Sequence, residues 1–131
     1  MIRLYHYSQA DFRGYIDPLY FGANNYTNFS SKLSQVKRIY FYLEPIPFER
    51  QLEGCRYLYI SEVSKNKIYD LIKDPLKLLN KYKTIDGFFR KIKSLGYIGL
   101  LGHTTYKFEV ISLFKAVKII KKVVLNESIP Y

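Results

Sequence analysis

Short runs of β-branched and aromatic residues, separated by turn residues, recur along the chain and limit what it can fold into. These runs are residues 2–7, 36–45, 55–63, 67–71, 97–102, 108–114 and 117–125, and each predicts a strand. Because the strands do not alternate regularly with helices, a doubly wound parallel sheet is disfavoured. The pattern predicts an α+β fold with two packed, mostly antiparallel β-sheets and two or three short helices.

One stretch has a strong helical period, between Thr84 as a candidate N-cap and Gly96 as a helix stop. Its apolar residues are Ile85, Phe88, Phe89, Ile92 and Leu95. Their spacing places them on one face of a helix. The pair Asp74-Pro75 predicts a second helix over about 75–82, and the polar stretch 28–36 predicts one or two further helical turns.

The length of 131 residues predicts one domain spanning 1–131, which can bury about two thirds of the surface of its unfolded chain. We expect no signal peptide and no membrane span, because no apolar run approaches about 18 residues. Cys55 is the only cysteine, which excludes an internal disulfide and suits the reducing cytoplasm. The two histidines, His6 and His103, do not have the spacing of a zinc pair, and we expect no metal.

The chain is strongly basic, with 21 Lys and Arg against 11 Asp and Glu and a formal charge of +10. It also contains 14 tyrosines and no tryptophan. Cations contact phosphates and aromatic rings stack on bases, so this composition is one signature of nucleic-acid binding. The alternative is that the tyrosines are ordinary sheet residues and that the lysines of 117–125 protect a sheet edge from other chains.

His6 lies inside the apolar, aromatic run of the first predicted strand, where it shares a face with Leu4. It is either a core histidine with satisfied ring nitrogens or a group that orients a substrate. In the second run, Tyr40 is either a sheet aromatic or a flat platform for a planar ring.

Glu109 lies in a strictly alternating run, on the face that carries Ile111 and Leu113. A carboxylate on an apolar strand face costs free energy unless it is paired or used. The alternatives are a glutamate of an edge strand in solvent, or one bridged to Lys107 or Lys115.

Three motifs occur in a fixed order: "YHYS" at 5–8, "IYF" at 39–41, and "LGYIGLLGHTTYKFEVISLF" at 95–114. In this order they resemble the His-Tyr-Glu class of the ADP-ribosyltransferase fold, which includes diphtheria-like toxins and poly(ADP-ribose) polymerases. The late segment is similar to the ending of many small bacterial and phage members, and the resemblance spans essentially the whole chain. Small stand-alone members occur as toxins and as phage effectors against host machinery.

The resemblance implies an enzyme that cleaves the nicotinamide–ribose bond of NAD+ and transfers ADP-ribose to a macromolecular acceptor, a protein or a nucleic acid. The alternative is transfer to water alone, which is NAD+ hydrolysis. It implies that His6 binds a hydroxyl of the nicotinamide-side ribose and that the Tyr7 backbone holds the carboxamide. Tyr40 would stack on the nicotinamide ring. Glu109 would hold the ribose 2′-hydroxyl and stabilise the oxocarbenium-like sugar. No metal is required, since the leaving group departs as a neutral molecule.

The long loop that starts at Ser8 is expected to bind the adenosine diphosphate half through Arg13 and Asn24 or Asn25. The resemblance also has departures. Tyr7 stands where the family has a glycine, and Arg38 stands where a glycine usually precedes the second motif. Lys107, two residues before Glu109, is neither Glu nor Gln, which makes arginine a less favoured acceptor.

The alternative function is a non-catalytic basic module on the same fold, which docks on nucleic acid or on a partner protein. Fold does not guarantee activity, and Tyr7 is the residue that most favours this alternative.

Overall fold

The computed structural model describes residues 1–18, 38–46, 54–82, 84–103 and 109–125. The turns expected within 28–36 lie outside these residues. The described part of the chain contains no helix that is long and apolar enough to cross a membrane.

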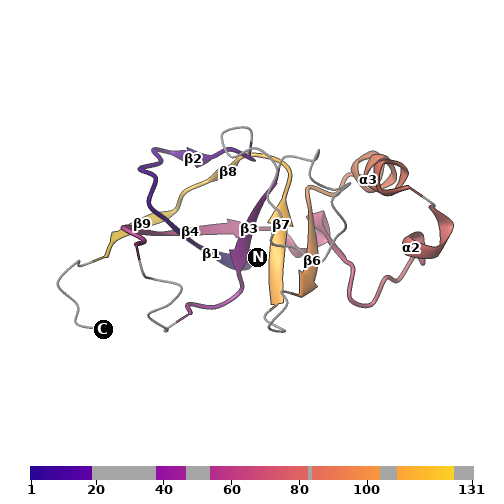
Figure 1. The fold of residues 1–131 in the computed structure, drawn as a ribbon, viewed down its shortest axis with the longest axis horizontal. Coiled ribbons are helices and arrows are strands. Elements are labelled where there is room, and N and C mark those ends of the chain that lie inside the picture. The colour runs from indigo at the N-terminus through magenta and orange to yellow at the C-terminus, as the bar shows by residue number, and fades with distance from the viewer. Residues whose placement is uncertain (19–37, 47–53, 83, 104–108, 126–131) are drawn as a thin grey trace.

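Seven strands form one sheet in the order β5-β6-β7-β3-β1-β4-β9 (Figure 1). Their bounds are β1 (Ile2–Ser8), β3 (Ile39–Tyr42), β4 (Tyr57–Val63), β5 (Ile68–Asp70), β6 (Gly99–His103), β7 (Glu109–Leu113) and β9 (Lys121–Val124). Only β5 and β6 pair in parallel among the described strands, and the other pairs are antiparallel. The expected α+β class with a mostly antiparallel sheet is therefore confirmed.

Among the described residues, the second sheet consists of β2 (Tyr15–Ile16) and β8 (Val117–Lys118). The run 117–125 is not one strand, because β8 pairs with β2 whereas β9 pairs with β4. Ile16 and Val117 are buried and belong to the core of the large sheet. The two-stranded sheet therefore packs on one face of the seven-stranded sheet.

Among the described residues, the pairing between β1 and β3 is shorter than the pairings on either side of it. β1 pairs with β4 over seven residues, and β3 pairs with β7 over four. Between β1 and β3, the one register pair within the described residues is Tyr5 with Tyr42. In Figure 1, β4 runs across the view whereas β3, β7 and β6 stand upright. Beyond this pair no further register pair joins β1 to β3 among the described residues, and this unpaired stretch of the two strands is here called the opening.

Register assigns every side chain of the large sheet to one of two faces. The face covered by β2 and β8, here called the ribbon face, contains the larger core: Leu4, Ile16, Ile39, Phe41, Tyr59, Val63, Ile68, Ile111, Leu113 and Val117. The opposite face, here called the helix face, contains the second core: Tyr69, Leu78, Phe88, Phe89, Ile92 and Leu100. This second core packs beneath α3 (Ile85–Ser94), at the β5 end of the sheet.

The helix α3 begins and ends as predicted. The Thr84 hydroxyl accepts a hydrogen bond from the Gly87 amide at 3.2 Å, and Gly96 has a φ of 90° beyond the last turn. A positive φ is strained for residues with a Cβ, so glycine fits this helix exit.

The helix expected over 75–82 is shorter, because α2 comprises only Leu78–Lys81. Asp74 and Lys77 have positive φ values of 44° and 53°, which no α-helix contains. The Asp74 carboxylate accepts the Tyr69 hydroxyl and the amides of Leu78 and Leu79, so it caps α2 from the preceding turn. A 3₁₀ turn at Lys65–Lys67 connects β4 to β5.

Candidate functional site

The strands that carry the three motifs are neighbours in the sheet. β7, β3 and β1 are adjacent, although Glu109 and His6 are a hundred residues apart in the sequence. β3 lies between β1 and β7 in the sheet. The opening between β1 and β3 therefore lies between the first and the third motif.

The His6 imidazole lies at this opening. Its Nδ1 lies 2.9 Å from the Tyr40 carbonyl oxygen, and its ring packs against Phe41 at a centroid distance of 5.3 Å. A carbonyl only accepts, so Nδ1 carries the proton and Nε2 is the acceptor nitrogen of the ring. Burial lowers the pKa of His6 to about 4, partly opposed by this hydrogen bond. At neutral pH the ring is therefore an uncharged acceptor with a fixed tautomer.

This lowered pKa predicts a loss of stability in mild acid. His6 binds a proton near pH 6.5 in the unfolded chain and only near pH 4 in the folded chain. The free energy of unfolding is therefore undiminished above pH 6.5 and decreases as the pH falls toward 4. The shift corresponds to at most about 3 kcal/mol. Urea denaturation at pH 7 and pH 4.5 should show a smaller pH dependence in His6→Gln than in the unmodified chain. A pKa of 6.5 or above in an NMR titration of the His6 imidazole would contradict the effect of burial on this group.

The backbone of Tyr7 points toward the same opening. The Ser8 carbonyl accepts the Arg56 amide at 3.1 Å, so the backbone groups of Ser8 face β4 and those of Tyr7 face β3. The Tyr7 side chain lies on the helix face, where its hydroxyl accepts the Ile46 amide at 3.1 Å. The Tyr7 side chain is therefore on the same face of the sheet as the Tyr40 ring, and His6 is on the other face.

The Tyr40 side chain does not share a face with the other two predicted residues. Strand alternation places it on the helix face with Tyr42, and the two rings meet edge to face at 6.1 Å. His6 is on the ribbon face, as is Phe41. The structure thus brings His6 against the Tyr40 backbone, while the Tyr40 ring lies on the other side of β3.

Glu109 is the first residue of β7, opposite His103 at the end of β6. Register places Glu109 on the ribbon face, because Ile111, two residues later in β7, pairs with Phe41 on that face. It is exposed, whereas the four residues that follow it in β7 are buried. The desolvation cost expected for a carboxylate on this apolar face is therefore avoided at the strand end.

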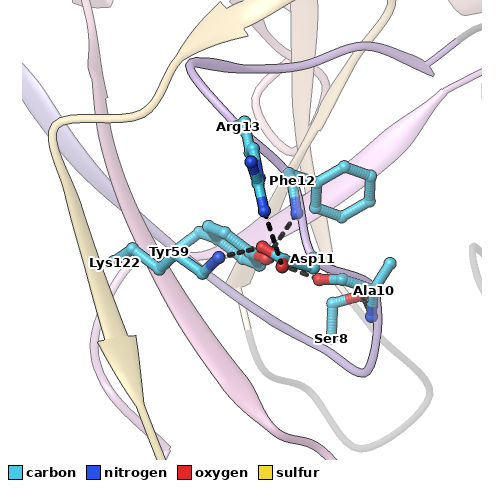
Figure 2. A network of polar contacts seen from close by, with 7 residues as sticks. All are labelled: Ser8, Ala10, Asp11, Phe12, Arg13, Tyr59 and Lys122. Atoms are coloured by element: carbon cyan, nitrogen blue, oxygen red, sulfur yellow. Dashed lines mark hydrogen bonds and ion pairs between the residues drawn. The ribbon is translucent and has the colours of Figure 1, made fainter.

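The described part of the loop after β1 is fixed by side chains of β4 and β9 (Figure 2). Ser8 Oγ accepts the Ala10 amide at 3.0 Å. The Arg13 guanidinium is 89% exposed and lies 3.9 Å from the Asp11 carboxylate, which also pairs with Lys122. The lysine bond lowers the pKa of Asp11. Ser8 and Arg13 are thus on one ordered segment, and Asn24, Asn25 and Lys107 lie outside the described residues.

Sequence reasoning missed Tyr59, which is paired with His6 in the register and is fully buried. Its alternation within 55–63 predicts a sheet residue, but nothing in the sequence indicates which groups its hydroxyl binds. The hydroxyl donates to the Ala10 carbonyl and accepts the Phe12 amide at 2.8 Å.

Among the described residues, no group of three or more His, Cys, Asp or Glu side chains could hold a metal ion. Burial raises the pKa of the Cys55 thiol, which disfavours the thiolate that a nucleophile or ligand requires. Comparison of the chain with protein families, curated proteins and solved structures finds no match.

Proposed function

We propose that this protein is an NAD+-dependent ADP-ribosyltransferase whose site is the opening between β1 and β3. One observation carries the proposal. The His6 ring of β1 donates to the Tyr40 carbonyl of β3, so residues of the first two motifs meet there, and β7 with Glu109 is the next strand.

NAD+ fits this opening by its nicotinamide end. The backbone of Tyr7 faces the opening and supplies a donor and an acceptor for the carboxamide, as in pairing with a strand. His6 Nε2 accepts a hydrogen bond from a hydroxyl of the adjoining ribose. A ligand between the two strands meets both faces of the sheet, so the Tyr40 ring on one face and Glu109 on the other are both available to it.

The reaction requires charge stabilisation at the sugar. The bond between nicotinamide and C1′ breaks, its electron pair leaves with the neutral nicotinamide, and the ribose becomes oxocarbenium-like. The Glu109 carboxylate accepts the 2′-hydroxyl and opposes the positive charge. A nucleophile of the acceptor then bonds to C1′ and loses its proton. A neutral His6 favours this step, because it adds no positive charge beside the cation.

Incubation with NAD+ tests the proposal. We expect the protein to release nicotinamide, measured by chromatography, and to transfer ADP-ribose to proteins or nucleic acid of a cell extract, measured as a mass increase. Release in water alone, without transfer, would indicate an NAD+ glycohydrolase at the same site. The absence of both NAD+ binding in calorimetry and nicotinamide release would overturn the proposal.

The distribution of charge supports the second candidate, a basic docking module. Residues 64–96 hold nine of the 21 basic residues and only three of the 11 acidic ones. Two of these acids, Asp70 and Asp74, accept backbone amides within their own turns. If the chain is a module, it should bind RNA or DNA with steep salt dependence and without NAD+. Its affinity should then be unchanged in Glu109→Gln.

A further inference from the structure

We propose that Tyr59 is a positioning residue for NAD+, which fixes the segment 8–13 so that Arg13 faces the diphosphate of the ligand. This inference rests on the proposed function and assigns a role to a residue that does not itself contact the reacting bond. The observation that supports it is the pair of hydrogen bonds made by the Tyr59 hydroxyl.

The Tyr59 hydroxyl bridges two backbone groups of the segment that follows β1. It donates to the Ala10 carbonyl and accepts the Phe12 amide at 2.8 Å. The Phe12 ring packs against the Tyr59 ring edge to face, with centroids 5.3 Å apart. Two of the residues between His6 and Arg13 are therefore tied to one side chain, which is fully buried and cannot move with the loop.

The position of Tyr59 couples this segment to His6. The two residues are directly paired between β1 and β4, so their side chains lie next to each other on the ribbon face. The Tyr59 hydroxyl thus ties residues 10 and 12 to the side chain next to the imidazole that binds the ribose in the proposed site. The diphosphate of NAD+ follows that ribose, and a cation is needed close to it.

Arg13 is the cation of this segment that remains accessible. Asp11 has two cationic partners, Lys122 and Arg13, and its contact with Arg13 is at the outer limit of an ion pair at 3.9 Å. Lys122 is held by Asp11 and by the Tyr57 ring, whose centroid is 4.4 Å from its ammonium (Figure 2 shows its approach to Asp11). The guanidinium is 89% exposed and can form two parallel bonds to a phosphate.

Tyr59→Phe removes only the hydroxyl, and Tyr57→Phe is the matched control on the same strand. We expect Tyr59→Phe to weaken NAD+ and ADP-ribose binding by the same factor, about tenfold, with kcat for nicotinamide release nearly unchanged. Both affinities should fall by the same factor, because both ligands contain the diphosphate that Arg13 would contact. ADP-ribose lacks only the nicotinamide. Tyr57→Phe should leave both affinities unchanged.

Hydrogen exchange of the Phe12 amide gives a readout that needs no ligand, and thermal denaturation checks that both variants fold. Exchange at Phe12 should be faster in Tyr59→Phe than in Tyr57→Phe. Unchanged affinities, or a lower kcat with unchanged affinities, would overturn the positioning role. If the unmodified chain binds neither NAD+ nor ADP-ribose, the proposed function itself fails. Unchanged hydrogen exchange at Phe12 in Tyr59→Phe would contradict, independently of any ligand, that the Tyr59 hydroxyl restrains this segment.

Discussion

Glu109→Gln is expected to lower the rate of nicotinamide release from NAD+ by about 10²- to 10³-fold. The substitution keeps the size of the side chain and its ability to accept a hydrogen bond, and removes the negative charge. In the proposed reaction this charge acts in the transition state, where the sugar becomes positive, so NAD+ binding should change by less than about threefold. Stability should change little, because Glu109 is exposed at the start of β7.

Glu62→Gln is the matched control. Glu62 is also in a strand, and its carboxylate forms an ion pair with Arg3 at 3.4 Å on the exposed surface. Such pairs contribute little to stability, so this variant should fold and cleave NAD+ at the unmodified rate. A release rate in Glu109→Gln within threefold of the control would contradict the catalytic role of Glu109.

Gly99→Ala is expected to destabilise the fold by about 2–3 kcal/mol. A Cβ at this position would lie 2.6 Å from the Ser112 carbonyl oxygen and 2.6 Å from Leu113 Cδ2. The leucine methyl can rotate away, but the carbonyl belongs to the backbone of β7 and cannot yield without moving the strand. Because β6 and β7 pair over five residues here, the clash strains the sheet that carries Glu109.

Gly102→Ala provides the comparison within the same strand. No atom lies within 4 Å of a Cβ at Gly102, so this variant should change the unfolding free energy by less than about 0.5 kcal/mol. Urea denaturation of both variants measures the difference. Equal stability of the two would contradict the close packing of β6 against β7.

Much of the fold could be predicted from local pattern. The alternation within 55–63 and 108–114 corresponds to β4 and β7, and the period of 84–96 corresponds to α3 with its Thr84 cap. The errors occur where tertiary contacts override a local signal. The pair Asp74-Pro75 predicts a helix start, but the Asp74 carboxylate binds Tyr69 and the amides of α2, so the chain turns first.

The site was only partly predictable for a related reason. The residue types and their order indicate His6, Tyr40 and Glu109, but a sequence does not state the register between strands. The register places the Tyr40 ring and Glu109 on opposite faces. It also places Tyr59 beside His6, and no pattern in the sequence indicates that its hydroxyl binds residues 10 and 12.

We propose that NAD+ binds at the opening between β1 and β3, with its reacting bond between His6 and Glu109. A crystal structure of Glu109→Gln with NAD+ tests it most directly, since slow cleavage preserves the intact ligand. We expect the carboxamide on the Tyr7 backbone, the nicotinamide-side ribose within hydrogen-bond distance of His6 Nε2, and residue 109 beside the 2′-hydroxyl. NAD+ bound elsewhere on the protein, with the opening between β1 and β3 empty, would contradict it.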